Sequence, residues 1–84
     1  MDFIRITTAR HVSGHQIALG FADGSEGVAD LSAELSGPVF APLRDIDYFK
    51  QFQIVGSTLE WPNGADFAPE FLHELACGRE AVLA

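Results

Sequence analysis

Residues 3–31 read FIRITTARHVSGHQIALGFADGSEGVADL, and this stretch carries the pattern that decides the fold. Two turn signals interrupt it, Ser13-Gly14 and Asp23-Gly24. They leave three apolar segments, at residues 3–12, 15–22 and 25–31. Glycine accepts a positive φ freely, and Asp-Gly between apolar segments is among the best short-range signals of a β-hairpin. The stretch therefore predicts three antiparallel strands joined by two hairpins.

Two-residue loops at both turns would fix the register of these strands. The expected cross-strand partners are Ile6 with Phe21, Thr8 with Leu19, Arg10 with Ile17, and Leu19 with Val28. This register places the large apolar side chains on one side of the sheet: Ile4, Ile6, Val12, Ile17, Leu19, Phe21 and Val28. A shift of one residue would move side chains to the other side, so the shared apolar face supports the register.

The opposite side of the expected central strand carries only small residues, Ala18, Gly20 and Ala22. They permit the close approach of a second copy of the chain, and two-fold dimers are the commonest oligomers. We therefore expect a homodimer through this strip. Two alternatives are a plain solvent face and coverage of the strip by the final helix of the same chain.

The middle of the chain predicts short and irregular elements. A single helical turn is expected at residues 31–35, and Pro42 keeps residues 39–43 out of any strand ladder. Asp45 is the expected N-cap of a short helix at residues 46–51.

A second hairpin is expected over residues 52–61, around Gly56-Ser57, with Ile54 facing Leu59. In the same register Phe52 faces Trp61. The last helix is expected to begin near Pro69, whose fixed φ suits the first helical position. Its apolar stripe consists of Phe71, Leu72, Leu75 and Ala76.

The fold class predicted from these elements is α+β: a small antiparallel sheet of about five strands built from hairpins, with two short helices. The length of 84 residues leaves room for one core. We expect a single domain over residues 1–84, ordered at about 3–78, with residues 79–84 either as a frayed tail or docked through Val82 and Leu83.

The charge of the chain limits its partners. Twelve acidic residues stand against five Lys and Arg, which gives a net charge of −7. Phosphate backbones repel such a surface, so direct binding of nucleic acid is not expected, whereas a small basic protein would be attracted. The sequence shows neither a membrane-spanning run nor the basic region of a signal peptide, and its one cysteine, Cys77, suits a reducing compartment. We therefore expect a cytoplasmic protein that does not bind membranes.

The densest polar segment, WPNGADFAPE from Trp61 to Glu70, is the candidate recognition loop, and its candidate residues are Trp61, Asn63, Asp66 and Glu70. In the functional interpretation these side chains rim a recognition surface. In the structural interpretation, Asn63-Gly64 makes a tight turn, Asp66 caps helix N–H groups, and Trp61 covers the core. The sequence leaves both open and favours the structural one.

The residues that could carry chemistry do not form a recognisable set. A zinc site needs three or four converging ligands, and His11 and His15 are expected on opposite faces of the first hairpin, far in sequence from His73. The serines sit in turns or at element ends, outside any Gly-x-Ser-x-Gly setting: Ser13, Ser25, Ser32, Ser36 and Ser57. We expect no catalytic residues, no metal and no cofactor, and an enzyme is the weaker class.

Four motifs together carry a resemblance to a family: Ile6-Thr7-x-Ala9-Arg10, Leu19-x-Phe21-x-Asp23-Gly24, Phe40-x-Pro42-Leu43-Arg44-Asp45 and Trp61-Pro62-Asn63-Gly64-Ala65-Asp66-x-x-Pro69-Glu70. Over residues 4–76 the chain resembles the small bacterial proteins grouped as domain of unknown function 2442. The resemblance implies an α+β fold with antiparallel strands and no known catalytic residues. Some members carry a C-terminal helix-turn-helix domain, which these 84 residues do not include, so direct regulation of DNA is not expected. Others are encoded beside a small partner protein, in an arrangement resembling toxin and antitoxin.

These observations favour a protein–protein interaction module, the antitoxin-like half of a two-protein pair. The charge favours a small basic protein as the partner. The alternative is a small ligand-binding domain or an enzyme that uses the Trp61–Glu70 loop.

Overall fold

The computed structural model describes residues 4–78, and its five antiparallel strands form two small sheets. The first sheet has the order β1-β2-β3, with β1 (Ile6–Ser13), β2 (Gln16–Phe21) and β3 (Glu26–Asp30). The second is the hairpin of β4 (Gln53–Val55) and β5 (Thr58–Glu60). The α+β class built from hairpins is confirmed, with the strands divided between two sheets. The expected frayed tail, 79–84, lies outside the described residues.

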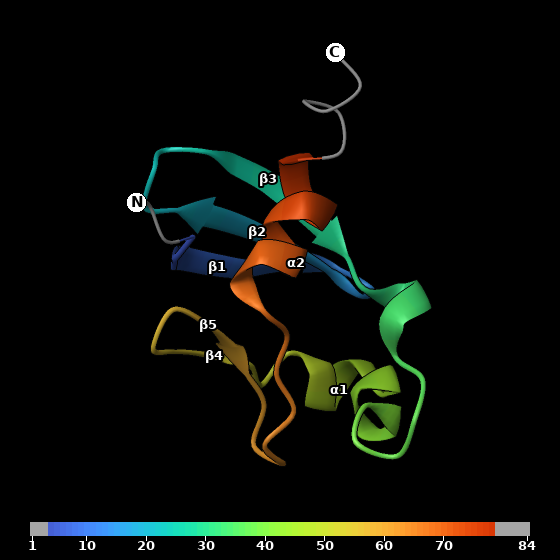
Figure 1. Cartoon of the computed structure of the whole chain (residues 1–84). Coiled ribbons are helices and arrows are strands. Elements are labelled where there is room, and N and C mark those ends of the chain that lie inside the picture. The colour runs from blue at the N-terminus through green and yellow to red at the C-terminus, as the bar shows by residue number, and fades with distance from the viewer. Residues whose placement is uncertain (1–3, 79–84) are drawn as a thin grey trace.

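The helical elements are short, as expected: η1 (Ser32–Glu34), η2 (Ala41–Arg44), α1 (Ile46–Phe49), α2 (Pro69–His73) and η3 (Glu74–Gly78), a π-helical turn that continues α2. The Asp45 side chain accepts a hydrogen bond from the Asp47 N–H at 3.2 Å, which confirms the predicted cap of α1. Figure 1 shows α2 crossing in front of the three-stranded sheet, with the β4–β5 hairpin and α1 below it. No helix within residues 4–78 is long and apolar enough to cross a membrane.

The first hairpin differs from the predicted register. Ile6 pairs with Phe21 as expected, but Leu19 pairs with Ala9 and not with Thr8. Two irregularities in β1 explain the shift, one between Ile6 and Thr8 and one between His11 and Ser13, because each changes the pairing by one residue. Likewise, Ile17 pairs with His11 and not with Arg10. The turn itself lies one residue later than predicted, at Gly14-His15.

The second hairpin also differs, because its loop has three residues. The Phe21 N–H donates to the Ser25 carbonyl at 2.9 Å, which encloses Ala22, Asp23 and Gly24. A two-residue type I′ turn would need a positive φ at both Asp23 and Gly24. In residues 4–78 only glycines have a positive φ, and Gly24 has one of 93°. The longer loop therefore avoids strain at Asp23.

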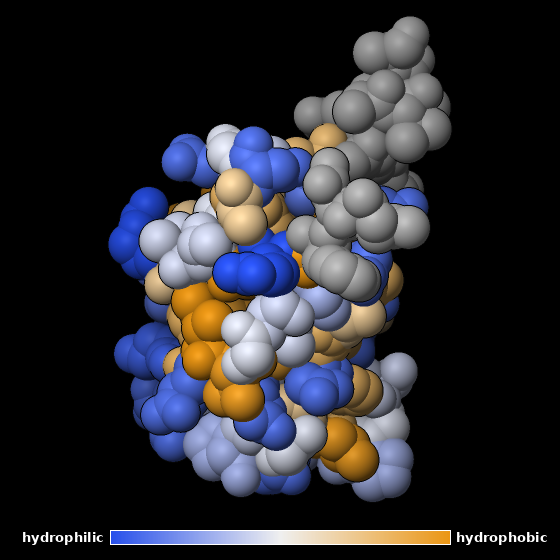
Figure 2. Space-filling model, turned by 60° about the vertical axis from the view of Figure 1, so that its left-hand side comes forward, coloured by the Kyte–Doolittle hydropathy of each residue, from blue (hydrophilic) through white to orange (hydrophobic). Residues whose placement is uncertain are grey.

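The shifted registers change which side chains face the core. Leu19 pairs with Gly27 and not with Val28, so Val28 points away from the core and is 46% exposed. Val12 is likewise 42% exposed, so its predicted place on the apolar side with Ile17 and Leu19 was wrong too. Ala29 and Leu31 take the buried positions on the third strand. Figure 2 shows hydrophobic residues gathered in small patches among hydrophilic ones on one face of the molecule.

The β4–β5 hairpin matches its prediction. Gly56 has a φ of 63° in the predicted two-residue turn, and Ile54 pairs with Leu59. Leu59 is fully buried, and the rings of Phe52 and Trp61 lie 6.2 Å apart at the open end of the hairpin. A hydrogen bond from the Ile6 N–H to the carbonyl of the turn residue Ser57 ties this hairpin to β1.

One cluster of buried apolar side chains joins the two sheets and the helices: Ile6, Ile17, Leu19, Phe21, Ala29, Leu31, Leu35, Leu43, Phe49, Leu59, Trp61, Ala65, Phe67 and Leu72. The elements α2 and η3 cover the core side of the first sheet by packing on β3. Gly27 permits this contact, because a Cβ at that position would clash with the carbonyl oxygen of Ala76. The final helix therefore does not cover the small-residue strip, which lies on the other side of the sheet.

We expect Gly27→Ala to lower the free energy of unfolding by about 1–3 kcal/mol, because the clashing Ala76 group is backbone and cannot rotate away. Gly20→Ala is a matched control in the neighbouring strand, where the new Cβ would meet only the rotatable hydroxyl of Thr8. Urea unfolding followed by circular dichroism measures both variants. Equal effects would contradict the close packing of η3 on β3.

Candidate functional site

Trp61, the first residue of the candidate recognition loop, lies inside the protein. It is 2% exposed, and its indole Nε1 donates to the Phe49 carbonyl at 2.8 Å. Its ring lies within 6 Å of the rings of Phe49 and Phe67. A side chain held this way supports the loop, and it presents almost no surface to a partner.

Asn63 also makes intramolecular contacts. Its amide nitrogen donates to the Val39 carbonyl at 2.9 Å, and its amide oxygen accepts the Ala65 N–H at 3.1 Å. These bonds hold the loop against the segment before η2. The loop turns the chain at Asn63-Gly64, as the structural interpretation predicted, and its bond to Val39 was not predicted.

Asp66 and Glu70 are exposed, as is Asn63. The predicted capping role of Asp66 was wrong, since the N-cap of α2 is Ala68 and no side chain caps that end. Glu70 lies in the first turn of α2, where a carboxylate is favourably placed. The structure thus buries Trp61 and leaves the other three candidates exposed, with Asn63 held by its two hydrogen bonds.

A hollow of about 370 Å³ lies beside this loop. Its lining comes from the second hairpin and the loop: Gln51, Gln53, Val55, Glu60, Trp61, Pro62 and Gly64. The hollow is the feature of the loop that could admit a small molecule.

His11 and His15 lie on the same side of the first hairpin, which corrects the prediction of opposite faces. Both imidazole rings pack against the Phe49 ring in a T-shaped arrangement, at centroid distances of 6.3 Å for His11 and 4.7 Å for His15. The shifted register causes this, because His11 pairs with Ile17 and so shares its core-facing side. The Nε2 of His15 donates to the carbonyls of Leu43 and Arg44, at 3.0 and 3.1 Å. Within residues 4–78 no three metal-ligating side chains gather into a potential ion site.

The structure brings together Asp23, Ser25 and His73, a group that the sequence analysis missed. The Ser25 Oγ lies 2.6 Å from the Asp23 carboxylate and 3.1 Å from the His73 Nε2. The carboxylate can only accept, so it takes the hydroxyl proton, and His73 donates to Ser25. Activation of a serine needs the reverse, with histidine accepting that proton. The cluster therefore fastens the β2–β3 turn to α2 and does not activate Ser25.

Hydrogen bonds lower the pKa of two exposed carboxyl groups. The side-chain and backbone hydrogen bonds from Ser25 lower the pKa of Asp23, with a smaller contribution from His73. The backbone N–H of Ser32, at 2.9 Å, is the largest cause of the lowered pKa of Asp30. Both carboxylates are therefore stabilised in their ionised form next to β3.

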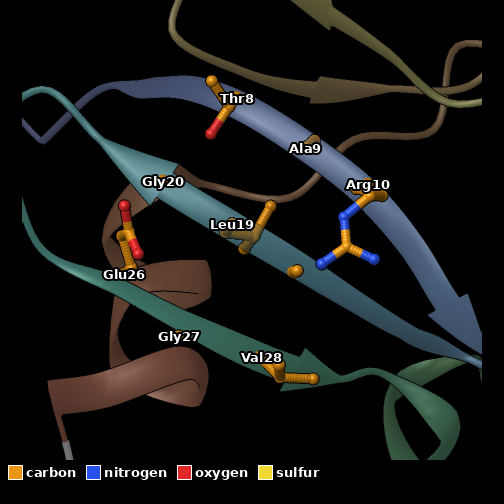
Figure 3. Close-up of a pocket in the computed structure, with 9 residues that line it drawn as sticks. Thr8, Ala9, Arg10, Leu19, Gly20, Glu26, Gly27 and Val28 are labelled. Atoms are coloured by element: carbon orange, nitrogen blue, oxygen red, sulfur yellow. The ribbon is translucent and has the colours of Figure 1, made fainter.

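The outer face of the first sheet, opposite α2, is hollowed along β2. The hollow measures about 560 Å³ and is lined by Thr8, Ala9, Arg10, Ala18, Leu19, Gly20, Glu26, Gly27 and Val28. Figure 3 shows Arg10 on β1 and Glu26 on β3, on the two sides of the central strand. Of the predicted small-residue strip, Ala18 and Gly20 line this hollow, while Ala22 lies in the turn after β2.

Comparison with protein families finds a match to the model described as Protein of unknown function (DUF2442), over residues 6–76. No curated protein and no solved structure matches the chain. The matched range includes all five strands and the whole candidate loop.

We expect Trp61→Phe to destabilise the fold by about 1–3 kcal/mol, because it removes the buried indole donor and leaves the Phe49 carbonyl without its partner. Asp66→Ala, in the same loop, should change the stability by less than about 0.5 kcal/mol, because that side chain is exposed. Chemical unfolding followed by circular dichroism tests the pair. A neutral Trp61→Phe would contradict the supporting role of Trp61.

We expect Ser25→Ala to raise the pKa of Asp23 toward the ordinary value of about 3.9, since it removes the largest cause of the shift. Ser32→Ala is the matched comparison: it keeps the backbone N–H that lowers the pKa of Asp30. NMR titration of the carboxyl carbons measures both.

The sign of the pH dependence follows from the lowered pKa. The ionised Asp23 favours the folded state, so its contribution is present above the pKa of the unfolded chain and is lost as the pH falls through the folded-state pKa. Ser25→Ala should therefore reduce the loss of stability in acid. Equal pKa shifts in both serine variants would contradict the assigned causes.

Proposed function

The chain belongs to the family described as Protein of unknown function (DUF2442), and we propose that it acts as a protein-binding module whose partner is a small basic protein. The proposal extends to the antitoxin-like half of a two-protein pair. The gene arrangement that the family resemblance implies supports this extension. The surface charge of the domain supports the nature of the partner.

One observation carries the proposal: an unbalanced acidic surface around the edge strand β3. The strand β3, the turn before it, α2 and η3 carry five exposed carboxylates and no Lys or Arg: Asp23, Glu26, Asp30, Glu70 and Glu74. The Lys and Arg of residues 4–78 lie on other segments, at Arg5, Arg10, Arg44 and Lys50, although the Arg5 carbonyl accepts the Ala22 N–H beside this turn. Because α2 and η3 pack on β3, Glu70 and Glu74 lie beside this strand on the helical side, whereas Glu26 and Asp30 lie on the outer face of the sheet.

A concentration of one charge sign accelerates the encounter with an oppositely charged partner and selects against like-charged ones. Within residues 4–78 the one ion pair joins Lys50 to Asp47, at 3.8 Å, and neither residue belongs to this acidic surface. The five carboxylates are thus not neutralised by cations of the described chain. A partner that carries lysines or arginines would supply the missing charge.

A second candidate function, a small ligand-binding domain, is favoured by the hollow of about 370 Å³ beside the Trp61–Glu70 loop. It predicts a bound metabolite on the protein purified from its host. Native mass spectrometry separates the two candidates, since a partner protein and a metabolite differ widely in mass.

We expect affinity capture from the native host to recover a small basic protein at equal stoichiometry. With the recovered protein purified, Glu70→Gln/Glu74→Gln should weaken binding roughly tenfold in calorimetric titration, since each lost ionic contact contributes up to about 1 kcal/mol. Both glutamates are exposed on the helical side of the acidic surface.

Glu34→Gln/Asp47→Asn is the matched control, because it removes the same charge from η1 and α1. Figure 1 shows α1 well separated from β3. This control should bind as the unchanged chain does. Equal weakening by both double variants would show that only the net charge matters and would overturn this acidic surface. A chain recovered alone, or with a metabolite, would overturn the protein-binding function.

A further inference from the structure

The outer face of the first sheet is a second surface, separate from the helical side. In the described part of the chain α2 and η3 pack on the core side of the sheet, and Figure 3 shows the helix behind the strands that line the hollow. Val12 and Val28 point out on this face and are 42% and 46% exposed. Ala18 lies beside Val28 and Gly20 beside Glu26, and these small residues leave a hollow along β2.

The hollow is bordered by one charge of each sign. Arg10 on β1 and Glu26 on β3 are both exposed, and neither makes an ion pair with any residue of the range 4–78. Arg10 lies opposite Ala18, and Glu26 lies opposite Gly20, so the two charges are offset by two residues along the strand direction. That offset is about 7 Å, which an arginine side chain can span.

We propose that this face binds a second copy of the same chain about a two-fold axis parallel to the strands. Such an axis places β1 of one copy over β3 of the other. Arg10 of each copy then meets Glu26 of its partner, which forms two equivalent ion pairs around the low centre of the face. The valines are buried against the facing sheet, and the small residues of β2 permit the close approach.

The charge pattern selects a second copy over other occupants. A basic partner would meet Arg10, and an acidic partner would meet Glu26, so each would face one repulsive contact. An identical face offers one charge of each sign in the positions that a two-fold axis makes complementary. Glu26 belongs to both proposed surfaces, but the function proposed above is tested at Glu70 and Glu74 on α2 and η3, so the two tests are separate.

The size of the face determines how tight the dimer is. A single three-stranded sheet face is smaller than the roughly 800 Å² per partner of a standard interface. We therefore expect a dissociation constant on the order of micromolar to hundreds of micromolar, typical of weak association. Sedimentation equilibrium should accordingly cover concentrations from about 5 μM to about 1 mM.

The test uses charge reversal. The unchanged chain should shift with concentration from its monomer mass of 9.1 kDa toward twice that mass. Arg10→Glu and Glu26→Arg should each weaken association by about tenfold or more, because each places like charges opposite one another. The double variant Arg10→Glu/Glu26→Arg should restore association, and an equimolar mixture of the two single variants should form a heterodimer.

General repulsion between the acidic chains would give a different result. Arg10→Glu makes the net charge more negative and Glu26→Arg makes it less negative, so repulsion alone would move their dissociation constants in opposite directions. Circular dichroism checks that each variant is folded. A mass of 9.1 kDa at every concentration would overturn the dimer. Association unchanged by the single reversals, or not restored by the double one, would overturn this face as its interface.

Discussion

The hydrogen bond from the Trp61 indole to the Phe49 carbonyl joins the parts of this small domain. Phe49 ends α1, and Trp61 follows β5, so the bond fixes one against the other. Phe49 also contacts the ring of His15 in the first hairpin, and Trp61 contacts Phe67 on the way to α2. A buried donor without an acceptor costs free energy. A domain of 84 residues has only a small net free energy of unfolding to lose. The aromatic cluster therefore holds the two sheets and the helices in one arrangement.

The sequence predicts the elements of this fold better than their pairing. The β4–β5 register was predictable, because Gly56 is the one residue there that takes a positive φ and a two-residue turn follows. The β1–β2 register was not, because its irregularities beside Thr7 and Val12 carry no glycine or proline to mark them. The β2–β3 register failed because Asp23-Gly24 fits both a two-residue and a three-residue loop. The three-residue loop is favoured because the two-residue loop would force a positive φ on Asp23, and a hydrophobic pattern does not reveal that strain.

The roles of the candidate site residues were predictable only where they depend on neighbouring residues in the sequence. The supporting role of Trp61 follows from its place between a hairpin and a helix, and local sequence suffices for that. The contact between Ser25 and His73 joins residues 48 positions apart, and it requires the packing of α2 on β3. The acidic surface likewise depends on that packing, because its carboxylates come from two distant segments. Composition predicted the excess of acid, and only the topology gathers these carboxylates around β3.

The shifted register also decides what the outer face can do. In the predicted register Val28 would have been buried opposite Leu19; in the observed one it is exposed, and Arg10 and Glu26 border the same hollow. The small residues of β2 then have charged neighbours of opposite sign on its two sides. Because α2 lies on the other side of the sheet, association through this face leaves the carboxylates of α2 directed outward in both copies. A dimer would thus carry two separate acidic surfaces, so self-association and the binding of a basic partner do not compete for the helical side.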